Sequence, residues 1–238
     1  MSSYKIGHTA MVLAAGYGTR MRPLTEKIPK PLIKVAGKSI IDYGFDRLRE
    51  AGVSKAIVNV HYLPEQLIAW SKTISSPETL VSDETDAILD TGGGIARALP
   101  LLGNDPFFVL NSDSFWIDND IPALQRLRDS WDEKMDCLLL LCDPKSTTGY
   151  SGDGDFVLAN DGQIKPQTAR GLTYIGAYLV HPRLFENAPA GKFSMWRMWE
   201  KALAKNTFYG LVHKGHWLHV GTPSAIAEAE NTLQRFEP

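Results

Sequence analysis

The sequence predicts an α/β protein in which a mixed, mainly parallel sheet is flanked by helices. Strand-like and helix-like segments alternate along the first half of the chain, and such alternation is typical of parallel sheets. An apolar run at residues 11–15 leads directly into a loop that contains Gly16 and Gly18. A second apolar run, at residues 105–111, leads into the polar residues 112–114. Loops that follow strands in this way are expected at the ligand-binding edge of the sheet.

Periodicity and turn residues define the elements of the first half. Residues 39–51 place apolar side chains at helical spacing and end at Gly52, so a helix is expected there. Residues 55–60 form a short apolar run that predicts a strand. The other elements expected are strands at residues 80–82 and 105–111, a helix at 64–71, and a helix that starts near Gly94 and stops before Pro100.

The second half is less regular and richer in strand signals. Residues 135–143 predict a buried strand, and residues 172–180 predict another. Asn160-Asp161-Gly162 is a strong hairpin signal that follows a turn and a strand near residues 152–158. An alanine- and glutamate-rich stretch at residues 224–235 predicts the last helix.

Composition excludes several classes of function. With 238 residues and 44% hydrophobic content, the chain can bury one good core, so residues 1–238 suit a single domain. A net charge of −2 gives no support for a nucleic-acid partner or a membrane-surface partner. No apolar run approaches the roughly 20 residues of a membrane span, and residues 1–10 lack the apolar core of a signal peptide. We therefore expect a cytoplasmic protein.

The two cysteines, Cys137 and Cys142, lie in one predicted strand. Because they are five residues apart, an odd number, their side chains are expected to face opposite sides of that strand. Neighbouring metal ligands are also missing from the sequence around them. We therefore expect two buried, reduced thiols rather than a disulfide or a zinc site.

The loop after residue 15 combines glycines with positive charge. Gly16 and Gly18 free the backbone to turn sharply, and such loops offer N–H groups to phosphate oxygens. Its prolines are expected to stiffen the connection without making it helical. Glycine pairs alone also fit an ordinary turn, but the cations of the loop favour a polyphosphate ligand. These cations are Arg20, Arg22, Lys27, Lys30 and Lys34.

Two further features follow along the chain. Asp113 comes directly after a buried strand, so it is expected to share a crevice with the glycine loop, although it also fits a cap for the next turn. Three consecutive glycines, Gly92 to Gly94, open a predicted helix. They fit either a flexible loop or a backbone that lies against a flat base, where any Cβ would clash.

The string LAAGYGTRMRPLT at residues 13–25 is followed by PKPL at residues 29–32. Together they resemble the opening signature of the sugar-1-phosphate nucleotidyltransferase family, L-A-A-G-x-G-[ST]-R-[ML]-x-P-x-T and then P-K-P-L. The resemblance implies a Rossmann-like fold of the nucleotide-diphospho-sugar transferase type, with a nucleotide-binding half at about residues 1–115 and a β-rich, sugar-binding half at about residues 116–238. It also implies an enzyme that transfers a nucleotidyl group from a nucleoside triphosphate to a sugar-1-phosphate and releases pyrophosphate, with Mg²⁺ as cofactor.

The resemblance also assigns roles to residues at matching positions. The catalytic candidates are Arg20, Lys30 and Asp113; LNSD at residues 110–113 stands where the family has a metal-binding aspartate, with Ser112 in place of the usual glycine. The nucleotide-binding candidates are Leu13, Ala14, Ala15, Gly16, Gly18, Thr19, Glu84, Thr91, Gly92 and Gly93. YIGAYLVHPRLF at residues 174–185 resembles the element that passes beneath the sugar, and the sugar-side candidates are Asp155, Tyr174 and Gly176. Lys165 fits either a contact with the sugar phosphate or an exposed surface.

One position departs from the family pattern. Relatives have W-x-D-[IV]-G-T, whose aspartate is the second carboxylate on the metal, whereas this chain has His219 there. Magnesium prefers oxygen ligands, and Mn²⁺ or Co²⁺ tolerates imidazole better. Magnesium is also bound by one carboxylate together with waters and substrate phosphates, so we expect Asp113 to hold it with His219 near a phosphate or in the outer shell. A histidine whose bonds are satisfied within its strand is the alternative.

Within the family, the compact length and several short segments most resemble members that join UTP to N-acetylmuramic acid-1-phosphate in peptidoglycan recycling. These segments are residues 91–95, residues 154–156 and the HPRLF string at 181–185. Mannose-1-phosphate guanylyltransferases and glucose-1-phosphate thymidylyltransferases, which share the first half of the pattern, are the alternatives. A protein that binds a nucleotide or sugar without catalysis is an alternative of another class. The sequence makes no prediction of oligomeric state.

Overall fold

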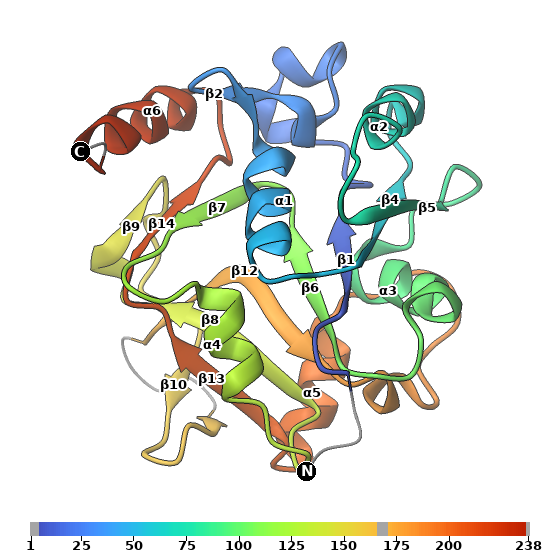
Figure 1. Ribbon diagram of the computed structural model, residues 1–238, viewed down its shortest axis with the longest axis vertical. Helices are drawn as coiled ribbons and strands as arrows, with labels where there is room; N and C mark the ends of the chain where they lie inside the picture. Colours follow the sequence, from blue (N-terminus) through green and yellow to red (C-terminus); the bar gives the residue numbers. More distant parts are fainter. Residues whose placement is uncertain (1–4, 166–170, 237–238) are drawn as a thin grey trace.

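A seven-stranded sheet forms the centre of the computed structural model, which describes residues 5–165 and 171–236. In spatial order its strands are β13 (Phe208–Val212), β8 (Cys137–Cys142), β12 (Thr173–Val180), β6 (Phe107–Asn111), β1 (Thr9–Leu13), β4 (Lys55–Val60) and β5 (Glu78–Asp83). Strand β12 runs antiparallel to both of its neighbours, and the other pairings of this sheet are parallel. Figure 1 shows β1 and β6 side by side near the middle of the molecule.

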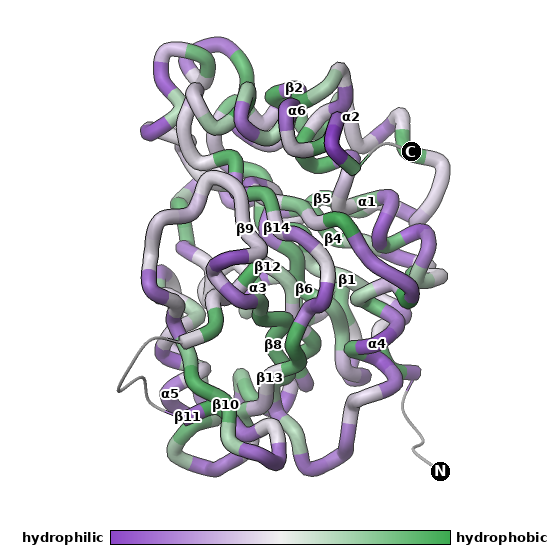
Figure 2. Tube along the Cα trace, turned by 90° about the vertical axis from the view of Figure 1, so that its left-hand side faces the viewer, coloured by the Kyte–Doolittle hydropathy of each residue, from purple (hydrophilic) through white to green (hydrophobic). Residues whose placement is uncertain are grey.

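Helices cover both faces of the central sheet. The helices of the first face are α1 (Ile40–Glu50), α2 (Pro64–Ser71) and α4 (Ala123–Asp129), and those of the second face are α3 (Asp90–Leu102) and α5 (Trp196–Ala204). Successive residues of β1 point to opposite faces, so Ala10 and Val12 join the first apolar cluster and Met11 joins the second. Strands buried on both faces have near-continuous apolar sequences, and hydrophobic residues accordingly concentrate along the strands in Figure 2.

Smaller sheets lie beside the central one. One contains β7 (Ser114–Ile117), β14 (His216–His219) and β9 (Thr147–Thr148); the others pair β2 (Lys34–Val35) with β3 (Lys38–Ser39) and β10 (Val157–Leu158) with β11 (Ile164–Lys165). The last helix, α6 (Ser224–Phe236), lies near β2 in Figure 1, where the Ala36 N–H donates to the Glu230 carboxylate at 2.9 Å. Ala229 of α6 joins Phe115 and Leu218 in a third apolar cluster, which fixes α6 against β7 and β14.

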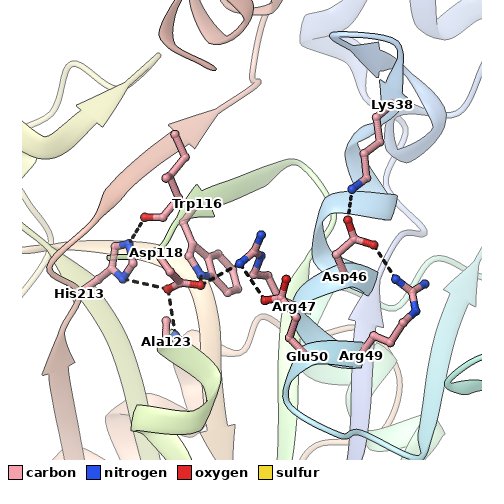
Figure 3. A network of polar contacts seen from close by, with 10 residues as sticks. Lys38, Asp46, Arg47, Arg49, Glu50, Trp116, Asp118, Ala123 and His213 are labelled. Carbon is pink, nitrogen blue, oxygen red and sulfur yellow. Dashed lines mark hydrogen bonds and ion pairs between the residues drawn. The ribbon is translucent and has the colours of Figure 1, made fainter. Parts of the chain in front are cut away.

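A polar network ties the two halves of the chain together on one side of the sheet (Figure 3). The carboxylate of Asp118 accepts from Arg47 of α1 at 3.1 Å, from Trp116 of β7 at 3.2 Å and from the Ala123 N–H of α4 at 2.9 Å. The buried ring of His213 lies beside it, with Nδ1 3.9 Å from Asp118 Oδ1. Elements from distant parts of the sequence therefore converge on one buried carboxylate.

The predicted α/β class with a mixed, mainly parallel sheet is confirmed. Helix α2 and strand β4 match their predicted ranges, and the other predicted elements differ from the observed ones mainly at their ends. The hairpin at Asn160-Asp161-Gly162 joins β10 to β11, with Gly162 at φ +82°, where glycine is favoured. In the described residues, no helix combines the length and the apolar character that crossing a bilayer requires.

The expectation for the two cysteines is confirmed. Both are free and buried, and Cys137 packs in the second apolar cluster while Cys142 packs in the first. Burial raises the pKa of Cys142 to about 12 and raises the pKa of Cys137 well above its usual range. Because the thiolate is the reactive form, these thiols are inert at neutral pH.

Two predictions about the first loop were wrong. The first strand ends at Leu13 rather than residue 15, because the Ala14 N–H donates to the side chain of Asn59 instead of continuing the ladder. The loop is also not free of helical turns, because single 3₁₀ turns form in it, one at the left-handed Gly18 and two at Pro23, Pro29 and Pro31, which fix φ. These turns are η1 (Thr19–Met21), η2 (Leu24–Glu26) and η3 (Lys30–Leu32); later ones are η4 (Pro144–Ser146) and η5 (Pro182–Phe185).

The bounds predicted for α3 were also wrong. The helix begins at Asp90, so the glycine triplet lies inside it, and it continues past Pro100 to Leu102. Proline lacks an N–H, but only the last turn follows it, and the fully packed side chain of Leu102 anchors that turn in the second cluster. The Gly103 N–H then closes the helix on the Leu99 carbonyl at 3.1 Å. Tertiary packing has overridden a local stop signal.

Candidate active site

A cavity of about 480 Å³ opens near the carboxyl ends of β1, β4 and β6. Leu13, Asn59 and Asn111, which lie at or near those strand ends, form part of its wall. The predicted site residues on the wall are Leu13, Ala14, Ala15, Gly16, Gly18, Thr19, Arg20, Lys30, Glu84, Thr91 and Asp113. Open α/β sheets bind ligands at this edge, and cavities of roughly 300–1,000 Å³ suit small molecules.

A buried polar relay supports the start of the glycine loop. The Ala14 N–H donates to Asn59 Oδ1 at 2.7 Å, and Asn59 Nδ2 donates to Glu84 Oε1 at 2.7 Å. The other oxygen of Glu84 accepts from the Leu89 N–H at 3.1 Å, just before α3. Burial raises the pKa of Glu84, and these bonds oppose the shift. A Cβ on Gly94 would lie 2.6 Å from Glu84 Oε1, so the relay also favours glycine at position 94 of α3. A role of Glu84 in binding the nucleotide stays a prediction.

The two glycines of the loop have different surroundings. Gly18 has φ +61°, and a Cβ there would lie 2.9 Å from the side chain of Thr25 and 3.0 Å from that of Lys30. The Thr25 hydroxyl also donates to the Gly18 carbonyl at 2.9 Å. By contrast, a Cβ on Gly16 would meet no atom within 4 Å. The fold therefore requires glycine at position 18, whereas at position 16 glycine keeps space open on the cavity wall.

Arg20 is held at the cavity by its neighbour. It lies in η1, whose next residue, Met21, is fully buried in the third apolar cluster. The Arg20 side chain is exposed, lines the cavity and forms no ion pair within residues 5–165 and 171–236. The backbone of Arg20 is therefore fixed while its guanidinium remains available, and this combination suits binding of an anionic ligand.

Lys30 and Asp113 meet on the cavity wall, as the shared crevice predicted. Lys30 Nζ lies 2.9 Å from Asp113 Oδ2, and His219 Nε2 lies 3.9 Å from the same oxygen. Burial by itself raises the pKa of Asp113, but the interactions with His219 and Lys30 outweigh it and hold the pKa well below its usual range. Asp113 is therefore ionised at neutral pH and already has a cationic partner.

The glycine triplet packs on protein at the start of α3. The N–H groups of Gly92 and Gly93 both donate to the Phe193 carbonyl at 3.0 Å. A Cβ on Gly92 would collide with the Phe193 ring, and one on Gly93 would collide with the Gly191 carbonyl. Thr91 lines the cavity and its hydroxyl accepts from a backbone N–H, but Gly92 and Gly93 are not on the cavity wall. Their contact with a base stays a prediction, and packing already explains why they are glycines.

A family model described as nucleotidyl transferase matches residues 9–235, which include the glycine loop, Lys30, Asp113 and His219. The chain belongs to the nucleotidyl transferase family. The family and the enzyme class expected from the first loop are thereby confirmed. Members of the family commonly use a divalent metal ion.

Two relatives within the nucleotidyl transferase family cover almost the whole chain. The N-acetylmuramate alpha-1-phosphate uridylyltransferase of Caulobacter vibrioides is 41% identical over 232 residues, which are 94% of this chain and 96% of that protein. The protein of the same name from Neisseria meningitidis serogroup B is 36% identical over 226 residues, 93% of this chain and 96% of that protein. A probable mannose-1-phosphate guanylyltransferase of Oryza sativa is 27% identical, and this chain spans 61% of its length.

Solved structures of other nucleotidyl transferases share the fold. A UDP-glucose pyrophosphorylase complexed with UDP-glucose superposes with a TM-score of 0.78 at 20% identity, covering 98% of this chain and all of that one (100%). An inositol-1-phosphate CTP transferase from T. maritima superposes with a TM-score of 0.74 at 17% identity, covering 95% of this chain and 98% of that one. At these identities the likeness shows the fold.

The carboxylate of Asp113 can hold a divalent ion at the nucleotidyl transferase site, and its role as the metal ligand stays a prediction. His219 Nδ1 donates to the Gly149 carbonyl at 3.2 Å, which turns Nε2 toward Asp113, 3.9 Å from Oδ2. In the part of the chain that the structure describes, no group of three His, Cys, Asp or Glu side chains forms a metal cluster. Magnesium needs no such cluster, because one or two carboxylates together with substrate phosphates and waters bind it.

The predicted sugar-side residues of this nucleotidyl transferase lie off the cavity wall. Asp155 Oδ2 accepts from the Thr173 hydroxyl at 2.8 Å and from the Tyr174 N–H at 2.9 Å, so this carboxylate ties its loop to β12. The Tyr174 ring packs edge-on against Trp199 with centroids 5.2 Å apart, and burial raises the pKa of Tyr174 well above its usual range.

Gly176 lies at an irregularity of strand β12 and close to neighbouring strands. It has φ +85° and lies where the pairing of β12 with β8 shifts register, so it occupies a bulge. A Cβ there would also lie 2.7 Å from Ser114 Oγ and 3.2 Å from Asn111 Cβ, so the backbone closely approaches its neighbours. Asn111 lines the cavity, so the absence of a side chain at Gly176 lets Asn111 keep its position on the cavity wall.

Sequence reasoning missed several residues on the cavity wall. Lys192 lies in the loop between η5 and α5, and Asp90 opens α3 in a left-handed conformation with φ +62°. Tyr17 also lines the cavity, and its hydroxyl lies 3.0 Å from His61 Nε2. Asn59 was detectable as an amide inside an apolar strand. No motif marks Lys192.

Proposed function

We propose that this chain transfers the uridylyl group of UTP to N-acetylmuramic acid-1-phosphate, giving UDP-N-acetylmuramic acid and pyrophosphate. The Lys30–Asp113 ion pair on the wall of the glycine-loop cavity carries the proposal for the reaction type. The two relatives of 41% and 36% identity, both named for this activity, support the substrate pair. The proposal places the enzyme in the cytoplasm, where UTP is available, in peptidoglycan recycling.

The nucleotide lies against the first half of the chain, residues 1–115, in this proposal. Residues 15–19 offer backbone N–H groups, while Leu13 and Ala14 hold the start of the loop, and the open space at Gly16 lets a phosphate approach the backbone. The base lies toward Glu84 and the start of α3 at Thr91 to Gly93. That placement is supported by Glu84 and Thr91, which both line the cavity.

The reaction needs alignment and charge screening more than a base. The acceptor phosphate is already ionised, so its oxygen attacks the α-phosphorus of UTP while the bond from that phosphorus to the β-phosphate oxygen breaks. Lys30 stabilises the charge that develops at the α-phosphoryl group, and Arg20 stabilises the pyrophosphate that leaves. A divalent ion, Mg²⁺ or else Mn²⁺ or Co²⁺, held by Asp113 and phosphate oxygens with His219 beside it, would neutralise phosphate charge.

The acceptor lies toward the second half, residues 116–238, with Asp155, Tyr174 and Gly176 shaping its side of the site. The support is structural: Asp155 fixes the start of β12, and Gly176 sets the position of Asn111. Lys165 contributes nothing to the proposal, because it is exposed on β11 and its Nζ donates to Gln163 Oε1 at 2.9 Å.

The test measures pyrophosphate release from UTP, dTTP, GTP and CTP, each paired with the 1-phosphates of N-acetylmuramic acid, N-acetylglucosamine, glucose and mannose, under Mg²⁺ and Mn²⁺. We expect a clear preference for UTP with N-acetylmuramic acid-1-phosphate. Preference for GTP with mannose-1-phosphate, or for dTTP with glucose-1-phosphate, would replace the substrate and keep the reaction. If no pair reacts with either metal while His219→Asp restores activity, the natural chain is a binding protein.

A further inference from the structure

One cation on the cavity wall comes from the second half of the chain. Lys192 is exposed, and within residues 5–165 and 171–236 its side chain forms no hydrogen bond or ion pair. Arg20 and Lys30 also line the wall, but both precede residue 31, and Lys30 is paired with Asp113. Lys192 is therefore a cation without a function in the fold.

The backbone on both sides of Lys192 is fixed by α3. Phe193 is buried, its N–H donates to the Leu89 carbonyl at 3.1 Å, and its own carbonyl accepts from two N–H groups of the glycine triplet. Gly191, at φ +75°, lies so close to Gly93 that a Cβ on Gly93 would collide with its carbonyl. The missing side chains of the triplet thus let this loop dock on α3. Docking places Lys192 at the cavity. Because the backbone is already fixed, only the lysine side chain loses conformational entropy when a ligand binds.

We propose that Lys192 binds an anionic group of the acceptor and helps to select it. The inference rests on the proposed function, in which the acceptor carries a 1-phosphate and the lactyl carboxylate of muramic acid. The sugar-side candidates Asp155, Tyr174 and Gly176 supply no positive charge, and Lys165 is bonded to Gln163 on the exposed hairpin. Among the described residues of the second half, Lys192 is the cation on the cavity wall. Phosphate and carboxylate are both oxyanions that an ammonium group binds.

The test compares Lys192→Met, which keeps the apolar stem, with Lys192→Arg, which keeps the charge. Steady-state rates are measured with N-acetylmuramic acid-1-phosphate and with N-acetylglucosamine-1-phosphate, which lacks the lactyl group; where the latter does not react, its inhibition constant is measured. We expect Lys192→Met to raise the KM for the muramic acid phosphate roughly tenfold to a hundredfold, as loss of a charge-assisted hydrogen bond does. The KM for UTP should not change, and Lys192→Arg should recover most of the loss.

The pattern across the two acceptors identifies the anion. A larger effect on the muramic acid phosphate assigns the lactyl carboxylate, whereas equal effects on both acceptors assign the shared phosphate. Unchanged KM or inhibition constants for both acceptors, or a change confined to the KM for UTP, would overturn the proposal.

Lys205→Met, at an exposed position after α5, is the control for loss of one positive charge. A wild-type protein that reacts with no pair would refute the proposed function before any Lys192 variant is made. A Lys192→Met protein with a lowered unfolding midpoint would be replaced by Lys192→Gln.

Discussion

Asp113 is the residue on which the charges of the site converge. One of its oxygens faces both Lys30 Nζ at 2.9 Å and His219 Nε2 at 3.9 Å, which keeps the carboxylate ionised at the edge of the sheet. Lys30 and Arg20 lie within one loop, yet among the described residues only Lys30 of the two forms an ion pair. Before a ligand binds, Lys30 is therefore bound to a carboxylate, whereas Arg20 is available to the ligand.

Arg20→Ala and Lys30→Ala should each lower the rate of nucleotidyl transfer roughly 10²- to 10³-fold, as loss of a preorganised donor does. The fold should persist, because neither side chain contributes to an apolar cluster. Rates of pyrophosphate release at saturating substrate measure the effect. Arg22→Ala and Lys27→Ala are matched controls, since both positions are exposed in the same loop and neither lies on the cavity wall. Near-full turnover in the Arg20 or Lys30 variant would contradict the assigned roles.

Gly16→Ala and Gly18→Ala should separate function from folding. At Gly16 a Cβ has open space, so we expect the free energy of unfolding to change by less than about 0.5 kcal/mol, while catalysis falls because the methyl group occupies cavity space. At Gly18, left-handed backbone and contact with Thr25 should destabilise the protein by about 1–2 kcal/mol or more. Denaturant unfolding and kcat/KM for the nucleotide are measured on both. A fully active Gly16→Ala protein would mean that no ligand approaches the backbone there.

At the scale of elements, the docking of the 191–193 loop on α3 joins two parts of the chain that are remote in sequence. Gly93→Ala should force the Gly191 carbonyl away and loosen the loop, since rigid backbone rather than a flexible side chain blocks the added Cβ. We expect lower stability, faster hydrogen exchange at Gly92 and Gly93, and a weaker effect of Lys192→Met in this background. Protected amides at these positions would show that the loop tolerates the methyl group.

In helix α1, by contrast with α3, a glycine can be replaced by alanine without a collision. Gly44 lies in the middle of α1, and a Cβ there would make an ordinary contact with Leu110 at 3.5 Å. Gly44→Ala should therefore raise the free energy of unfolding by up to about 1 kcal/mol, the difference in helix propensity between the two residues. The unfolding midpoint measures it, with no change expected in kcat/KM. A loss of stability would indicate that Leu110 cannot accept the methyl group.

These elements also show what local sequence predicts and what it does not. Helix α2 and strand β4 follow from apolar spacing, because each buries one continuous face or run. The start of α3 was missed because only proline has a lower helix propensity than glycine. Contacts with Phe193 and Gly191 are what make glycine necessary there. Distant residues hold that helix, so no window of local sequence contains the reason.

The same distinction applies to the site. The glycine loop and Asp113 were predictable, because each follows an apolar strand and parallel strands end at one edge. Asn59 supports the loop from 45 residues away, and Lys192 reaches the cavity through contacts with α3. Asn59 was detectable only as an amide inside an apolar strand, and no motif marks Lys192. The roles proposed for Asp155 and Gly176 rest on resemblance, and the contacts found for both are with other parts of the chain.

At the scale of the whole molecule, His213 beside Asp118 and His216 on β14 make stability depend on pH. Burial lowers the pKa of His213, although Asp118 opposes the shift, and burial also lowers the pKa of His216. Unfolding restores both to about 6.5, so below that pH the unfolded chain binds more protons than the folded one. The free energy of unfolding should therefore fall as the pH drops below about 6.5, until the folded histidines also become protonated.

Urea unfolding of the wild type and of His213→Gln from pH 5 to pH 8 tests this dependence. The variant is expected to lose stability at pH 8, because the bond from His213 Nε2 to the Ile117 carbonyl is weakened, and to show a smaller decline toward pH 5. His8→Gln, at an exposed position, should keep the wild-type slope. Identical slopes in the wild type and His213→Gln would assign the pH dependence to other groups.

The relay beneath the glycine loop also constrains how this sequence can diverge. Gly94 leaves no room for a Cβ because Glu84 and Asn59 fill the space, and Asn59 in turn holds the Ala14 N–H. An alanine at position 94 is therefore compatible with the fold only if position 84 or 59 carries a smaller side chain. A shortened side chain at position 59 would release the Ala14 N–H, and one at position 84 would leave Asn59 Nδ2 without its acceptor. Among homologues, positions 59, 84 and 94 should thus change together or not at all, and an alignment in which they vary independently would show that the loop has a second means of support.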